Sequence, residues 1–329
     1  MMALGHIFMR REAGIALMIV LFCLAVGLFK PQFLTLDSLR IILLLTPLIM
    51  IGAMGQMLVL VARHVDLSIG SMLGFSAMVV GMMFKFYPEI WWPLGFLVAI
   101  GVGAALGLVN GALVTIFKLP AIIVTLGTLN LYRGLTYIIS NARQIDRQFV
   151  PSELKAMSQT SPFFGIPWII FISFGIALLT YWFVMHTRVG RQIFALGSNP
   201  VAAPLRGIDV TRVTLLVFTL SGALAGLAGI LYASRWGFVN PSNTGAGFEF
   251  QVIAAVVIGG VSINGGVGTV LGTVLGVLLL GCVAAALPLL GIPGTTQNAI
   301  YGAVILVALL IDRTVRQRGI AALSSRSQA

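Results

Sequence analysis

Five polar residues interrupt apolar stretches in the first half of the chain: Asn110, Thr125, Thr128, Asn130 and Arg133. Their amide, hydroxyl and guanidinium groups supply hydrogen-bond donors and acceptors, so they are candidates for lining a translocation path. Each could instead hydrogen-bond to a neighbouring helix, and for any single residue that alternative is the stronger one. We expect Arg133 to face protein or water, because an unpaired guanidinium near a membrane centre costs about 2.5–3.5 kcal/mol on insertion scales.

The residues that catalysis would need are not arranged for it. The sequence contains no G-x-x-x-x-G-K-[ST], so the chain has no P-loop with which to hold nucleotide phosphates. Its three histidines, His6, His64 and His186, lie far from one another and from Cys23 and Cys282, which gives no support for a metal centre or a nucleophile–base pair. We therefore expect no enzyme activity and no cofactor bound by this chain.

The composition is that of a membrane protein. The 329 residues are 59% hydrophobic and 9% charged, and the mean hydropathy is +1.05, whereas soluble domains are roughly 45–50% apolar and about 25% charged. At about 20 residues per span, residues 1–329 predict one all-α polytopic domain. The ten candidate spans are 13–29, 41–62, 67–84, 93–117, 120–140, 168–185, 213–235, 250–263, 269–290 and 296–311.

The distribution of basic residues predicts the orientation. With a cytoplasmic N terminus, twelve Lys and Arg residues fall at cytoplasmic ends and loops and seven on the outer side, in agreement with the positive-inside rule. Both termini, the loop 186–212 and a basic tail at 312–329 are then cytoplasmic. The net charge of +11 is spread over span ends and forms no long basic run, so we expect no nucleic-acid partner.

All nine acidic residues are predicted at span ends or in loops, and none in mid-membrane. An ion-coupled secondary carrier usually needs an ionisable group inside the membrane, so that alternative is disfavoured but stays open, as does a passive channel-like protein. Asp66 or Ser68 is expected to cap the helix that starts beside it.

Two glycine triplets at a spacing of four residues predict close helix packing. They are Gly103, Gly107 and Gly111 in the fourth span, and Gly268, Gly272 and Gly276 in the ninth. The two spans run in opposite directions and lie five spans apart, which predicts that spans 2–5 and 7–10 form inverted repeats, an arrangement common in transporters. The short eighth span, followed by glycines, is typical of a broken helix beside a cavity.

The loop 186–212 has the features of a docking segment. Ser198 or Asn199 is a good N-cap, Pro200 suits a first helical turn, and Gly207 suits a helix end. A short helix from about Pro200 to Arg206 is expected, with a small face of Ala202 and Ala203 able to enter a cleft. The surrounding arginines could meet acidic groups on a partner or anionic membrane lipid.

This loop resembles the coupling loop of the ribose-type sugar permeases of bacterial ABC importers, through GR at 190–191, ALGSN at 195–199, AA at 202–203 and GI at 207–208. Nearly the whole chain shares the resemblance. The other matching stretches are DLSIGS at 66–71, NG at 110–111, PAIIVTLGT at 120–128, GAGFE at 245–249, GGVS at 259–262 and GGVG at 265–268.

The resemblance implies a permease subunit of about ten spans in the bacterial inner membrane. It also implies a second permease, cytoplasmic ATPases that carry ATP and Mg²⁺, and a periplasmic substrate-binding protein, with residues 199–207 as the coupling helix. Pro204 departs from the family pattern and should strain or shorten that helix. RG at 133–134 and VPSELK at 150–155 look closest to autoinducer-2 permeases, followed by those for rhamnose, ribose and other pentoses.

Overall fold

The computed structural model describes residues 2–161, 165–293, 296, 299–303 and 306, with the side chains of residues 2–11 left aside. Most of the predicted tenth span and the whole basic tail 312–329 lie outside this part. The α-helices are α1 Met2–Phe29, α2 Leu36–Leu45, α3 Pro47–Val61, α4 Ile69–Phe86, α5 Leu94–Ile116, α6 Ala121–Ser140, α7 Ser152–Gln159, α8 Trp168–His186, α9 Arg188–Ser198, α10 Val210–Trp236, α11 Phe248–Ile258 and α12 Val270–Leu289. Three 3-10 turns join them: η1 Pro31–Leu34, η2 Arg147–Phe149 and η3 Pro204–Arg206.

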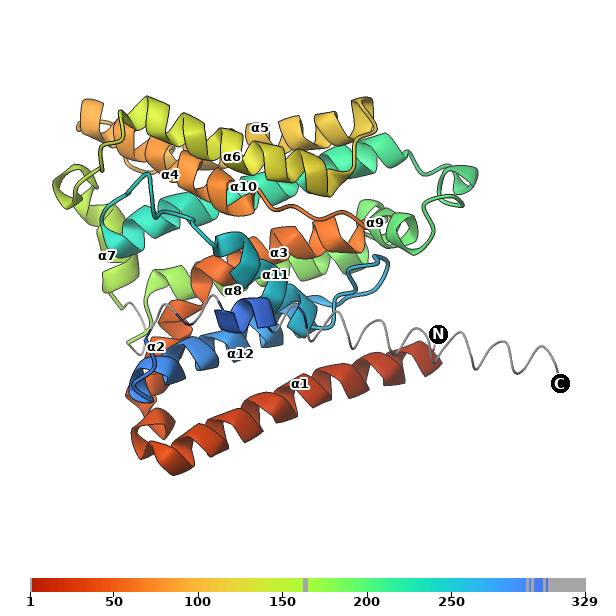
Figure 1. Ribbon diagram of the computed structural model, residues 1–329, viewed down its shortest axis with the longest axis horizontal. Coiled ribbons are helices and arrows are strands. Elements are labelled where there is room, and N and C mark those ends of the chain that lie inside the picture. Colours follow the sequence, from red (N-terminus) through yellow and green to blue (C-terminus); the bar gives the residue numbers. More distant parts are fainter. Residues whose placement is uncertain (1, 162–164, 294–295, 297–298, 304–305, 307–329) are drawn as a thin grey trace.

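Within the described residues, the all-α polytopic fold is confirmed. Seven helices are long and apolar enough to cross a membrane, and α2 with α3, bent by 44°, raises the count to eight if the pair is one span. Helix α11, which lies where the span 250–263 was predicted, has only 11 residues, so the prediction that this segment is short is also confirmed. Helix α1 packs along α12 at one edge of the bundle, and α5 and α6 form the opposite edge (Figure 1).

The bend in the second span has a local cause. Pro47 has no N–H to donate to the carbonyl of Leu43, so the helix cannot continue unbroken. The hydroxyl of Thr46 donates to that carbonyl instead, at 3.2 Å, and the Arg235 guanidinium donates to the carbonyl of Leu44. The break thus leaves two carbonyls for side chains to satisfy, and one of those side chains comes from α10.

The glycines of both triplets, apart from Gly268, which faces the Val261 side chain, pack against backbone, but against different partners. A Cβ at Gly103 or Gly107 would collide with carbonyl oxygens of α10, those of Gly222 and Phe218. A Cβ at Gly272 or Gly276 would collide with carbonyls at the end of α11. Close packing is therefore confirmed, whereas the triplets do not occupy equivalent interfaces and cannot by themselves carry the inverted repeat.

The arrangement of helices fits the predicted repeat better than the glycines do. Helix α5 packs on α10, and its counterpart α12 packs on α2 and α3; likewise α4 packs on α10, and α11 on α3. Helix α9 and the N terminus lie at one end of the bundle and α7 at the other (Figure 1). The repeat, and which end faces the cytoplasm, stay predictions.

Candidate functional site

The connection between α3 and α4 turns back into the bundle, so α4 starts inside it (Figure 1). Helix α3 ends at Val61, and Arg63 adopts a left-handed conformation with φ of 68°. The chain then runs without regular secondary structure through Asp66 to Ser68, the residue before α4. The Asp66 and Ser68 side chains are both fully buried. A loop predicted at a membrane surface thus becomes a polar segment within the bundle.

A chain of hydrogen bonds links this segment to α5 and α6. The carboxylate Oδ1 of Asp66 accepts from the N–H and the hydroxyl of Ser68, at 2.9 and 2.7 Å. The Asn110 amide donates to the Ser68 hydroxyl at 2.7 Å and accepts from the Tyr132 hydroxyl at 3.0 Å. With its amide oriented to satisfy both groups, Gln56 of α3 bonds to the backbone C=O and N–H of Asp66 at 3.1 and 3.3 Å. Asp66, Ser68, Asn110 and Tyr132, with Gln56, are called the central cluster below.

Two of the acidic residues predicted at span ends or in loops do lie at such positions but are buried in the bundle. Asp66, in the connection that enters the bundle before α4, is 0% exposed, and Glu249, in the first turn of α11, is 7% exposed. Asp66 Oδ2, Glu249 Oε2 and the Ser221 hydroxyl have no hydrogen-bond partner among the described residues. The argument against an ion-coupled carrier from absent buried charges therefore loses its force.

The N-termini of α4 and α11 meet beside the central cluster. A Cβ at Gly70 would collide with the Gly245 carbonyl and with the Glu249 carboxylate, so only glycine permits this approach. The Arg133 guanidinium, from α6, donates to the carbonyl of Thr244 at 2.6 Å. Arg133 therefore faces protein, as its desolvation cost predicted.

The other candidate path residues separate into two groups. Thr125 is fully buried, and its hydroxyl approaches the carbonyls of Ala121 and Val65 at 2.8 and 3.3 Å. Thr128 is buried one turn further along α6, where its hydroxyl approaches the carbonyl of Thr125 at 3.4 Å. Asn130 lies on the exposed face of α6 and bonds to the carbonyl of Leu126 in its own helix at 3.0 Å. The structure thus places Asn110 and Thr125 against the α3–α4 connection, buries Thr128 in α6 and leaves Asn130 exposed. A path role stays a prediction for each.

The sequence reasoning missed Gln56, Tyr132 and Ser221. All three are polar residues in otherwise apolar helices, the same signal that selected Asn110. The prediction that Asp66 or Ser68 caps α4 is wrong. Ser68 makes no side-chain cap, and the Asp66 carboxylate accepts from the N–H of Ser68, the residue before the helix, not from an N–H of α4.

The proposed docking loop contains a helix that was not predicted. Helix α9 begins after Thr187, whose hydroxyl accepts from the N–H of Gly190 at 3.0 Å. It buries Ile193 and Leu196 against the bundle and exposes Arg188 and Arg191. The expected helix start at residues 198–200 is therefore the end of α9.

After α9, the expected helix from Pro200 to Arg206 is wrong in form. The Asn199 side chain caps as predicted, accepting from the N–H groups of Val201 and Ala202 at 3.1 and 3.0 Å. A turn and then the one-turn helix η3 follow, because Pro204 has no N–H with which to extend an α-helix. Gly207 ends the segment with φ of 75°, as its position predicted.

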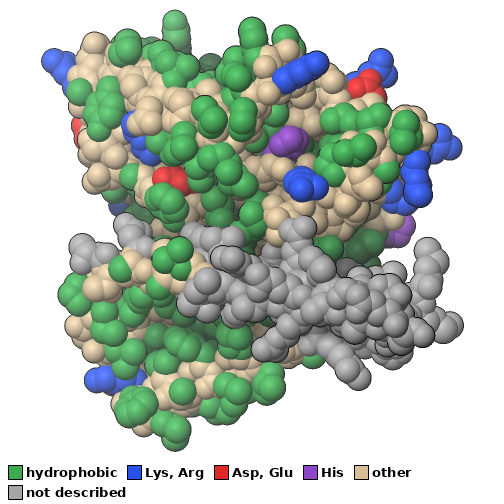
Figure 2. Space-filling model, turned by 45° about the vertical axis from the view of Figure 1, so that its right-hand side comes forward, with side chains coloured by type: hydrophobic (Ala, Val, Ile, Leu, Met, Phe, Trp, Pro, Cys, Tyr) green, Lys and Arg blue, Asp and Glu red, His purple; other side chains and the backbone are tan. Residues whose placement is uncertain are grey.

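The exposed residues of this segment also differ from those expected. Ala203 is 3% exposed and so packs inward, whereas Val201 and Leu205 are 82% and 86% exposed. Arg206 is exposed beside them. Figure 2 shows Lys and Arg side chains gathered toward the right of the view, among hydrophobic ones. We call Val201, Leu205 and Arg206 the docking tip. In the sequence, the two large apolar residues between Asn199 and Gly207, four positions apart, were the signal that could have identified it.

The C-terminal end of α9, which leads into residues 199–207, packs against the end of α3. The N–H of Gly266, from the loop between α11 and α12, donates to the carbonyl of Val61 at 2.9 Å. A Cβ at Gly197 would collide with that same carbonyl, and one at Gly265 would lie 2.7 Å from the Cβ of Arg63. The ends of α3 and α9 thus meet the 265–266 loop without intervening side chains. Val61, at this contact, precedes Asp66 by five residues.

Comparison with known proteins bears on this arrangement. A family model described as branched-chain amino acid transport system / permease component matches residues 38–309. The chain is 36% identical over 306 residues to the autoinducer 2 import system permease protein LsrC of Salmonella typhi, covering 93% of this chain and 86% of that relative. It is 35% identical over 309 residues to the LsrC protein of Photorhabdus luminescens, covering 92% and 90% of the two chains. No solved structure matches the chain.

The family match spans most of the chain, from within α2 to beyond α12, and it includes the central cluster and the docking segment. The relatives match over nearly their whole length, which confirms the resemblance to ribose-type ABC permeases. The chain therefore belongs to the permease component family of these transport systems, as a multi-pass membrane transport subunit.

Proposed function

We propose that this chain is the membrane-spanning subunit of an ATP-binding-cassette importer for a small sugar or sugar-like solute in the bacterial inner membrane. Autoinducer 2 is the first candidate, because relatives at 36% identity are named as its import permeases; rhamnose, ribose and other monosaccharides come next. A separate cytoplasmic ATPase binds ATP and Mg²⁺. A second permease subunit completes the path, and a periplasmic binding protein delivers the solute.

The docking tip is the observation that carries this proposal. Val201 and Leu205 are more than four-fifths exposed, and exposed arginines lie on both sides of them along the chain. Apolar side chains held out at the end of a membrane bundle, within a polar rim, suit burial in a protein partner. The arginines at 188, 191, 206 and 212 then face acidic groups of that partner or the headgroups of anionic lipid.

The seat of the docking segment supplies a mechanical connection. Movement of residues 199–207 acts on Val61 through Gly197 and Gly266. Val61 is followed by the connection that carries Asp66 and Ser68 into the central cluster. Closure of the ATPases would thereby shift the start of α4 against α11 and alternate access to the two sides.

An ion-coupled secondary carrier is the second candidate, because Asp66 and Glu249 are buried carboxylates inside the bundle. Uptake of radiolabelled autoinducer 2, ribose and rhamnose into proteoliposomes separates the two. Vesicles that contain this chain with its ATPase and binding protein should take up one solute only when ATP is supplied, and not when the ATPase lacks its P-loop lysine. Uptake by this chain alone, driven by a proton or sodium gradient, would overturn the proposal.

A further inference from the structure

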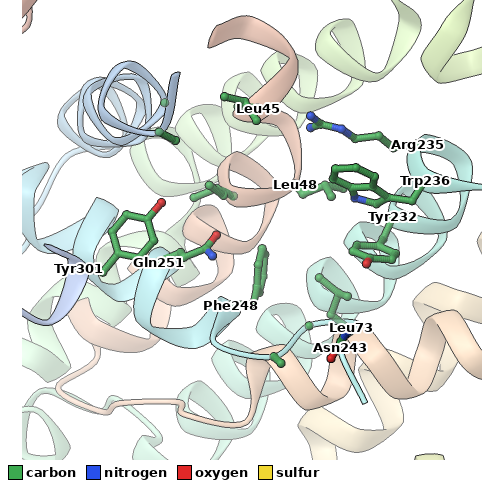
Figure 3. Close-up of a pocket in the computed structure, with 15 residues that line it drawn as sticks. Leu45, Leu48, Leu73, Tyr232, Arg235, Trp236, Asn243, Phe248, Gln251 and Tyr301 are labelled. Atoms are coloured by element: carbon green, nitrogen blue, oxygen red, sulfur yellow. The ribbon is translucent and has the colours of Figure 1, made fainter. Parts of the chain in front are cut away.

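A cavity of about 210 Å³ lies between the bend of the α2–α3 span, the end of α10, the start of α11 and α12. In Figure 3, Tyr232, Arg235 and Trp236 lie on one side of it, and Gln251 and Tyr301 on the other. At about 30 Å³ per molecule in the liquid, the volume corresponds to about seven waters. It therefore has room for one compact solute.

The lining combines aromatic rings with a few planar polar groups. The rings are those of Tyr232, Trp236 and Tyr301, and the polar groups are those of Arg235, Asn243 and Gln251. Aromatic faces suit the C–H face of a small ring, whereas amides and a guanidinium can donate to and accept from several hydroxyls. A mostly apolar wall with a few convergent polar groups is the usual composition of a small-molecule site.

The guanidinium of Arg235, the charged group in the lining, is held in place by its neighbours. Arg235 donates to the carbonyl of Leu44 at the helix bend, and its guanidinium lies 5.1 Å from the ring centroid of Trp236. The rings of Tyr232 and Trp236 are 6.2 Å apart. A solute would thus meet side chains whose positions are already set, which lowers the entropy lost on binding.

The cavity also has a rim and a floor. Trp236 is 46% exposed, and Asn243 and Ala246 are exposed, so the rim lies at the end of α10, where the outer side is predicted. The loop that holds Gly245 and Phe248 forms the floor. On its other face, this loop receives the hydrogen bond from Arg133 to the carbonyl of Thr244, so it separates the cavity from the central cluster.

We propose that this cavity is an outer binding site for a small polyhydroxylated solute, occupied before the solute passes the Gly245–Phe248 floor. The inference rests on the proposed function, since it takes this solute to be the cargo. In this proposal Gln251 and Trp236 contact the solute, and Arg235 holds the Trp236 ring in position.

The first test measures uptake by the assembled importer with ribose and autoinducer 2 in separate arms. Gln251→Ala and Trp236→Ala each remove a contact with the solute, so the apparent KM should rise about three- to tenfold while kcat stays near wild type. Matched controls are Gln148→Ala, in the exposed outer loop, and Trp182→Ala, on the exposed face of α8. An unchanged KM in both cavity variants contradicts the proposal.

The second test reports occupancy without transport. In a Cys23→Ala, Cys282→Ala background, Ala284→Cys places a thiol in the lining of the cavity. Saturating ribose or autoinducer 2 should slow its reaction with a small thiol reagent at least threefold, and Gln251→Ala should raise the solute concentration needed for half-maximal protection about three- to tenfold. Ala105→Cys, exposed on α5, should react at the same rate with and without solute.

The two proposals fail differently. If ATP drives uptake and the transported solute leaves the labelling of Ala284→Cys unchanged, the cavity assignment is wrong and the importer assignment stands. If the solute protects Ala284→Cys while uptake ignores ATP, the importer assignment is wrong and the binding site stands.

Discussion

The side-chain amide of Asn110 on α5 donates to the hydroxyl of Ser68, 2.7 Å away and 42 residues earlier in the sequence, at the point where α4 begins inside the bundle. Asn110 also accepts from Tyr132 of α6. One amide therefore ties three helices together where the membrane offers no water to replace a lost bond.

Asn110→Ala should lower the free energy of unfolding by about 1–3 kcal/mol, because it leaves buried groups without a partner. Thermal unfolding of the purified protein in detergent measures the change. Asn130→Ala is the matched control, since Asn130 is exposed and bonds only within its own helix. Equal destabilisation by both variants would contradict the role of the cluster.

Leu205→Asp should weaken binding of the ATPase about thirtyfold, because a central apolar anchor of an interface contributes about 2 kcal/mol or more. Co-purification with the ATPase and binding by the detergent-solubilised chain check this. Leu36→Asp changes a leucine that is 83% exposed elsewhere, after the first span, and should leave binding intact. Normal ATPase binding by Leu205→Asp would exclude the docking tip as the contact.

Gly107→Val should prevent correct assembly, because the added Cβ would overlap the carbonyl of Phe218 on α10. Backbone cannot yield as a flexible side chain can, so we expect loss of the folded protein from the membrane fraction. Gly101→Val, on the same helix with nothing within 4 Å of its added Cβ, should accumulate normally. Comparable yields of the two variants would show that α5 and α10 can separate.

Thr46→Val removes the hydroxyl that replaces the missing N–H of Pro47 and leaves the carbonyl of Leu43 unsatisfied. A loss of about 1–3 kcal/mol in the free energy of unfolding is expected. Thr115→Val also removes a hydroxyl bonded to a carbonyl, that of Gly111, but within the continuous helix α5, so its effect should be smaller. Thermal unfolding compares them, and the reverse order would show that the bend does not depend on Thr46.

The sequence predicted what depends on local pattern. Apolar runs located the spans, glycines at a spacing of four residues located the tightest packing, and Asn199 and Gly207 marked the ends of a turn. These features follow from hydropathy, capping and backbone freedom within a few residues.

Tertiary placement could not be derived in the same way. Asp66 looks like any acid at a span end until the α3–α4 connection is seen to turn inward. The exposure of Leu205 and burial of Ala203 depend on how Pro204 divides the segment into a turn and η3. Helix α9 was missed because its charged face made the whole stretch read as a loop.

Two connections enter the bundle from opposite ends, 62–68 from the end with α9 and 237–247 from the end with α7 (Figure 1). They bring the starts of α4 and α11 together at Gly70 and Gly245. A permeating molecule that reached this point from either side would meet the contact between these two backbone segments, so movement of α4 against α11 would open or close its path.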